Sequence, residues 1–350
     1  MSTAVLATPQ KPWRPSFRQA IPELIGAIAT IAITFAVVGY SPLKGKLGFV
    51  GALFIVAIVI SSLITGIRRD RKAAFNSIST IFVYVAAILV IAPLASILFE
   101  IVSRGIGGLS LGIFTADMSV TASDAPLEEG GLLHALIGSL YIVFLATLVS
   151  VPVGLLTALY LTEINGKAAA IVRFFVQAMS GIPSIVAGLF IYAVWMIALG
   201  NQYSAGAGAM ALAILMIPTV ARTSEEVLKL IPQDLREAGT ALGGTQWRTV
   251  AMIVIPAARS GLVTAIILGV ARVVGETAPL LLTVGGADAI NLNPGQGNMS
   301  AFPYYVWKNL LIGNENSISR AWLGVFVLMI LVLIIFTLAR YFSTVRGNKK

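Results

Sequence analysis

The sequence predicts an all-α, polytopic transmembrane helix bundle, and three observations support this prediction. Of the 350 residues, 57% are hydrophobic and only 11% are charged, and the mean hydropathy is +0.91. Soluble domains carry about 25% charged residues, so a chain of this size cannot cover so much apolar surface with so few charges. The sequence contains no cysteine and one histidine, His134, which excludes a disulfide scaffold, thiol chemistry and His-rich metal sites.

The number of spans follows from the lengths of the apolar runs. A helix needs about 20 predominantly apolar residues to cross a bilayer. Eight runs approach or exceed this length: 22–40, 48–66, 78–101, 135–161, 172–199, 205–221, 259–283 and 322–341. The first is too long for the core of a signal peptide and lacks a clear cleavage site, so we expect it to remain as a span.

The distribution of basic residues predicts the orientation of the bundle. Eight crossings place both termini on one side, and basic residues gather in cytoplasmic segments. With the termini in the cytoplasm, most basic residues lie inside, among them Lys11, Arg14, Arg18, Arg68, Arg69, Arg71, Lys72, Arg236, Arg248, Arg346, Lys349 and Lys350. Lys44 and Lys46 lie outside and count mildly against this topology. The net charge of +9 is therefore mostly a topology signal, and we expect no nucleic-acid partner.

The long inner segment, about 222–258, carries the most informative pattern. Thr223 and Glu226 have the spacing of a capping box, which predicts the start of a short helix that Pro232 interrupts. A second helix is predicted from Pro232 to the Gly243-Gly244 pair. Within it, one narrow apolar stripe with small residues would admit another protein surface: Leu235, Ala238, Gly239 and Leu242. The alternative is a helix that lies on its own bundle.

Three charged residues in or near the spans suggest an anion path. Arg272 and Glu276 fall within the run 259–283, four residues apart and hence on one helix face if the helix is continuous. An intramembrane charge is costly and indicates function, and the planar fork of Arg suits phosphate. A structural ion pair that locks two helices together is the alternative. Arg222, at the inner end of a span, alone reads as an ordinary positive-inside arginine.

One stretch resembles a known family. The segments Glu237-Ala238-Gly239, Gly243 and Ile253-Val254-Ile255-Pro256 have the spacing of the EAA signature of type I ABC-importer permeases, with Gly239 replacing Ala and Ile255 replacing Leu. The resemblance implies a MetI-like core in which Glu237, Ala238, Gly239 and Gly243 couple to a separate ATPase. The chain has no Gly-rich P-loop of its own, so we expect a non-enzymatic transport subunit without a cofactor, while ATP and Mg²⁺ bind the partner.

Further motifs resemble the PstA type of phosphate-importer permease: Ser180–Val186, Arg222-Thr223, Gly275–Leu281 and Met299–Pro303. This resemblance implies ATP-driven import of inorganic phosphate across a bacterial cell inner membrane, with Arg222, Arg272 and Glu276 along the substrate path. It also implies a PstC-type permease, two PstB-type ATPases and an extracytoplasmic phosphate-binding protein as partners. Residues 1–75, with two additional spans, precede the expected permease core at 76–345. Permeases for sulfate or molybdate, and an autonomous channel or ion-coupled transporter, are the alternatives.

Overall fold

The computed structural model describes residues 17–40, 45–68 and 70–345, and these residues form helices joined by loops. Within this part of the chain the only β pairing is an isolated bridge between Gly285 and Met299. The expected all-α class is therefore confirmed. Several of the basic residues used to predict the topology lie outside the described residues: Lys11, Arg14, Lys44, Arg69, Arg346, Lys349 and Lys350.

The chain divides into two compact units between Leu98 and Phe99, inside the third helix. The first unit contains α1 (Phe17–Tyr40), α2 (Lys46–Arg68) and most of α3 (Arg71–Gly105). Helices α1 and α2 pack together, with the rings of Phe35 and Phe49 5.0 Å apart between their centroids. Gly26 permits close approach of Ile64, because a Cβ at this glycine would lie 2.8 Å from the Ile64 side chain.

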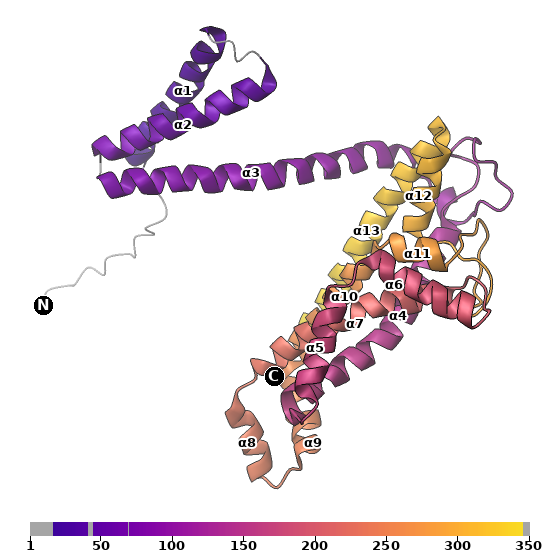
Figure 1. The fold of residues 1–350 in the computed structure, drawn as a ribbon. Helices are drawn as coiled ribbons and strands as arrows, with labels where there is room; N and C mark the ends of the chain where they lie inside the picture. The colour runs from indigo at the N-terminus through magenta and orange to yellow at the C-terminus, as the bar shows by residue number, and fades with distance from the viewer. Residues whose placement is uncertain (1–16, 41–44, 69, 346–350) are drawn as a thin grey trace, which may run out of the picture. The chain divides into compact units, whose positions relative to one another are not determined.

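The second unit is a bundle whose helices are broken at several points (Figure 1). Three of them run directly into π-helical segments: α4 (Leu133–Leu159) into η3 (Tyr160–Ile164), α6 (Ser184–Ile191) into η4 (Tyr192–Ala198), and α9 (Gln246–Thr249) into η5 (Val250–Val254). The remaining helices are α5 (Ala169–Ser180), α7 (Ala205–Lys229), α8 (Gln233–Ala241), α10 (Ile255–Val274), α11 (Ala278–Thr283), α12 (Phe302–Ile312) and α13 (Glu315–Val345).

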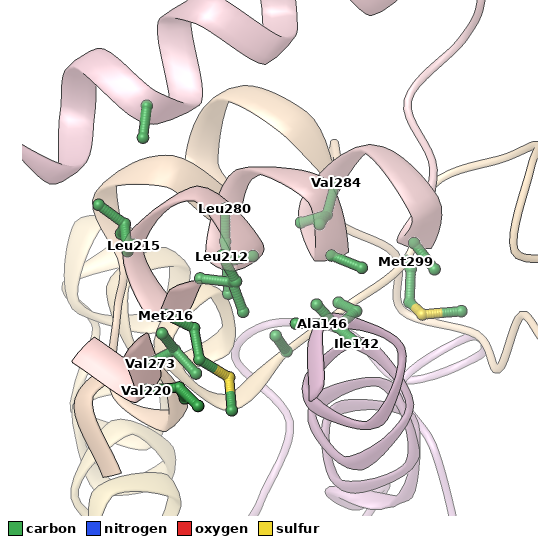
Figure 2. Close-up of a cluster of buried hydrophobic side chains, with 14 residues drawn as sticks. Ile142, Ala146, Leu212, Leu215, Met216, Val220, Val273, Leu280, Val284 and Met299 are labelled. Carbon is green, nitrogen blue, oxygen red and sulfur yellow. The ribbon is translucent and has the colours of Figure 1, made fainter. Parts of the chain in front are cut away.

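Helix α7 is the centre of this bundle. Two-thirds of its apolar window is buried, against 28% or less for the other single-helix spans. Small residues on its neighbours allow close approach: Gly154 of α4 and Gly269 of α10 both lie against Val220 of α7. Figure 2 shows the resulting cluster, in which Leu212, Leu215 and Met216 of α7 meet side chains from α4, α10 and α11.

The expected spans are present as helices, with two differences. In the part of the chain that the structure describes, six helices are long and apolar enough to cross a membrane, and the apolar segment Leu24–Tyr40 of α1 is shorter. The run 172–199 is not one straight span, because α5 and α6 meet at an angle of 103°. Pro183 lies at this bend, where it lacks an N–H donor and favours an extended residue before it. The run 259–283 is also broken, since α10 ends at Val274 and α11 begins at Ala278.

The expected capping box at Thr223 is wrong. Helix α7 continues without interruption through Thr223 and Glu226 to Lys229. Ser224 and Leu228 are fully buried in this last part, and Glu225 is nearly so. Tertiary packing therefore extends the helix past a local signal that favours a helix start.

Candidate coupling and anion-path site

Helix α8 is the short helix that the sequence predicts between Pro232 and the Gly243-Gly244 pair. Pro232 has an extended conformation (φ −57°, ψ 141°) at the position just before the helix, so Gln233 rather than Pro232 is the first helical residue. At the other end Gly243 has φ of +81°, a left-handed conformation that favours glycine and ends the helix. Figure 1 shows α8 and α9 at one end of the bundle, far from α11 and α12.

The expected apolar stripe on α8 does not form a single free face. Ala238 is exposed, as are the side chains of Leu235 and Leu242, the latter by 89%. Gly239 is instead buried against the chain itself, and a Cβ there would lie 2.7 Å from Thr249 and 2.8 Å from Ile253. The alternative of a helix lying on its own bundle therefore holds for Gly239, while the other three residues stay available. Glu237 and Gly243 are also exposed.

One arginine holds α8 to the bundle. The Arg236 guanidinium donates from Nε and Nη2 to the carboxylate of Glu163 in η3, at 2.8–3.2 Å. It also donates to the carbonyl oxygens of Leu228 (3.0 Å) and Ile231 (2.6 Å), where α7 ends. The Arg236 side chain is 18% exposed and that of Glu163 is 8% exposed. Removing one partner of such a buried pair costs about 3–5 kcal/mol, because the other charge is left uncompensated.

The hydrogen bonds that Arg236 donates to Glu163 raise the pKa of Arg236 further above its ordinary value. The guanidinium therefore stays charged at any physiological pH. Gln246, at the start of α9, donates to the backbone carbonyl of Glu163, so the same residue contacts the segments on both sides of the Gly243-Gly244 turn. Glu163 thus fixes the loop around α8 at two points.

A second charge cluster joins α5 to α7. Glu225, with its side chain 8% exposed, accepts hydrogen bonds from Arg173 of α5 and pairs with Lys229 one turn further along α7, both at 3.0 Å. Arg173 also donates to the carbonyl oxygen of Leu161, 3.1 Å away. A cavity of about 760 Å³ lies between the two charge clusters, and its lining includes Glu163, Arg173, Lys229, Arg236 and Glu237.

No motif in the sequence predicts this network of charged residues. The only signal was the isolation of Glu163, which is the sole acidic residue between Glu129 and Glu225 and follows directly after an apolar run. Its partner Arg236 lies 73 residues away, so the pairing emerges only in the folded chain.

The three residues expected along the anion path are not brought together as one group. Arg222 is exposed on α7 and lines a separate cavity of about 170 Å³, with Gln177 of α5 and Glu226 nearby. Arg272 is exposed in the last turn of α10, and Glu276 follows the end of that helix. Because α10 ends before Glu276, Arg272 and Glu276 do not share a helix face, and within the described residues they form no ion pair.

The packing of α10 on α7 places the two arginines at different levels. Gly261 lies against Val227 and Gly269 lies against Val220, so the two helices run antiparallel. With a rise of about 1.5 Å per residue, Arg272 lies about 8 Å, or one and a half helical turns, further from α8 than Arg222.

These features describe a bundle of membrane-spanning helices with a short, largely exposed helix, α8, at one end. The family "Binding-protein-dependent transport system inner membrane component" matches residues 150–345. A chain of the inward-facing MetNI methionine ABC transporter has the same fold, with a TM-score of 0.50 and 23% identity over 61% of this chain and 94% of that one.

Two relatives show which group within this family the chain resembles in sequence. The phosphate transport system permease protein PstA 1 of Mycobacterium tuberculosis H37Rv is 39% identical over 264 residues, which cover 75% of this chain and 85% of the relative. The PstA protein of Haemophilus influenzae is 38% identical over 270 residues, 74% of this chain and 90% of the relative. The chain belongs to the binding-protein-dependent inner-membrane family and, within it, to the PstA permeases, and is thus a multi-pass inner-membrane protein.

Proposed function

We propose that this chain is a transmembrane subunit of an ATP-driven importer that moves inorganic phosphate into the cytoplasm. The observation that supports this proposal best is the similarity to PstA permeases over three-quarters of the chain. The exposed part of α8 agrees with it, because a transport subunit without a nucleotide-binding loop needs a surface on which an ATPase can act.

The ATPase contact is assigned to the free part of the coupling segment. Leu242, at the end of α8, is 89% exposed, and Leu230, which lines the cavity, is 80% exposed. Exposed apolar residues gathered at one end of a bundle mark a protein interface. Glu237, Ala238 and Gly243 would lie at this contact, whereas Gly239 supports it from within. The partner ATPases, two of PstB type, would bind ATP and Mg²⁺.

The substrate path is assigned to Arg222, Arg272 and Glu276. Neither arginine forms an ion pair or a hydrogen bond with a side chain in the described ranges, so both guanidinium groups can donate paired hydrogen bonds to an oxyanion. A PstC-type permease would form the other wall of the path, and an extracytoplasmic phosphate-binding protein would deliver the anion at Arg272. Closure of the ATPase dimer would switch the bundle between its outward- and inward-facing states, with both termini of this chain in the cytoplasm.

Reconstitution tests this function. The chain is co-purified with its partner subunits, placed in proteoliposomes and supplied with ATP and the loaded binding protein. We expect uptake of labelled phosphate that stops without ATP and is not reduced by a tenfold excess of sulfate or molybdate. Equal competition by sulfate would assign the permease to another oxyanion, and uptake by this chain without an ATPase would indicate an autonomous transporter.

A further inference from the structure

Helix α8 contacts two π-helical segments of the bundle. Arg236 pairs with Glu163 in η3, which continues α4. Gly239, one turn further along α8, lies against Ile253 in η5, which leads into α10. A π-helical turn holds an extra residue that makes a helix locally adjustable, and such turns are frequent at functional sites. Both helix ends next to α8 therefore contain a segment that can change its pitch.

The contacts at Gly239 and Arg236 differ in the kind of interaction that attaches α8 to the bundle. Gly239 meets the side chains of Thr249 and Ile253 by van der Waals contact, which is not directional. Arg236 instead makes directional, charge-assisted hydrogen bonds to Glu163, and further ones to the carbonyl oxygens of Leu228 and Ile231. A displacement of α8 must therefore pull η3 and the end of α7 with it, or break this pair.

We propose that the Arg236–Glu163 pair is the positioning link that transmits a displacement of α8 to η3 and α4. The inference rests on the proposed function, since it requires a partner ATPase that moves α8. Arg236 and Glu163 touch neither substrate nor nucleotide in this role. They act by holding the coupling helix at a fixed distance from the helix that it drives.

A purely stabilising pair would behave differently. Its loss would reduce the amount of assembled complex, yet each complex that did assemble would import the same amount of phosphate per ATP. A transmitting pair predicts the reverse. The ATPase still docks on Leu235, Ala238 and Leu242 and hydrolyses ATP, but the bundle no longer follows, so the ratio of uptake to hydrolysis falls.

The test measures this ratio in reconstituted complexes of the full chain with its partners. Arg236→Gln removes the charge, Arg236→Lys keeps the charge without the fork, and Glu163→Asp shortens the carboxylate arm by one methylene. The matched control is Glu100→Gln, because the Glu100 side chain is 41% exposed and pairs, in the described part of the chain, with Arg104 one turn along its own helix, away from α8 and the cavities. We expect the ratio to fall at least tenfold in Arg236→Gln and by a smaller factor in the two conservative variants, with no change in the control.

The following outcomes would contradict the proposed role of the Arg236–Glu163 pair. An unchanged ratio in assembled Arg236→Gln complexes overturns it. If that variant does not assemble, an unchanged ratio in both Arg236→Lys and Glu163→Asp overturns it. Failure of all three variants to assemble would also overturn the proposal, because the pair would then be required for folding. A wild-type complex that imports no phosphate with ATP would instead contradict the proposed function.

Discussion

Gly239 of α8 lies so close to Thr249 that a single added methyl group would come within 2.7 Å of the threonine side chain. The same methyl group would also come within 2.8 Å of the Ile253 side chain. The small residue in the EAA-like segment is therefore required by the chain's own packing. Its neighbour Ala238, which is exposed, is the small residue that a partner protein can approach.

This relationship predicts opposite effects at adjacent positions. Gly239→Ala should lower the free energy of unfolding by about 1–3 kcal/mol through overpacking, more than the 0.5–1 kcal/mol that alanine gains over glycine in a helix. Ala238→Arg should leave the thermal stability of the purified chain unchanged, yet abolish co-purification of the ATPase and phosphate uptake. Thermal unfolding in detergent and co-purification measure the two effects. A stable Gly239→Ala variant, or normal ATPase binding by Ala238→Arg, would contradict this assignment of faces.

Local sequence patterns predict some features of this fold and not others. Apolar runs indicate the helices because the bilayer requires about 20 apolar residues whatever the tertiary contacts. The end of α8 at Gly243 is also local, since glycine alone supplies the left-handed conformation cheaply. The start of a helix at Thr223 was wrong because burial of Ser224 and Leu228 decides the course of α7 there.

The candidate site was less predictable because its contacts join distant segments. The spacing of Arg272 and Glu276 suggests an i,i+4 pair only if the helix continues, and Gly275 ends it. Glu163 and Arg236 are 73 residues apart, and no pattern in either segment indicates the other. The sequence indicated the coupling helix, but it did not indicate what attaches this helix to the bundle.

The orientation of the bundle predicts a labelling pattern. The chain has no cysteine, so single cysteines can be introduced against a low background. Ser110, Gln296 and Thr240 are all exposed, the first two in loops of the α12 end and the third on α8. With an impermeant thiol reagent on intact cells, we expect labelling at Ser110→Cys and Gln296→Cys and none at Thr240→Cys until the membrane is opened. External labelling at position 240 would invert the topology.

Arg320 predicts a second, separate stability effect. Its buried guanidinium, 3% exposed, donates to the carbonyl oxygens of Ser123, Ala125, Pro126 and Glu129 in the loop before α4. Each hydrogen bond to a charged group contributes about 1.5–3 kcal/mol, so Arg320→Ala should release this loop. We expect limited proteolysis between 117 and 131 to be at least tenfold faster than in the wild-type protein.

Arg104→Ala is the control for that measurement, because Arg104 is an exposed arginine paired with Glu100 on its own helix. Proteolysis in the control should match the wild type. If Arg320→Ala is cleaved no faster than Arg104→Ala, the loop is held by the other contacts from α13, such as those of Asn316 and Ser317.

The last prediction concerns Arg272, for which the structure separates two roles. A residue that locks α10 to Glu276 would need an ion pair, and none forms between them in the described chain. Arg272→Ala should therefore assemble with its partners at normal yield, while phosphate uptake falls at least tenfold because the anion loses its charge-assisted contact. Arg272→Lys should recover only part of the uptake, since lysine keeps the charge but lacks the two parallel donors.

Arg259→Ala is the matched control, an exposed arginine on the same helix near its other end. It should leave both assembly and uptake close to wild type. Full uptake by Arg272→Lys would show that this position needs only a positive charge and not the two parallel donors of arginine. Loss of assembly in Arg272→Ala, restored together with uptake by adding Glu276→Ala, would make the pair structural, because removing the stranded carboxylate can rescue folding but cannot supply an anion contact.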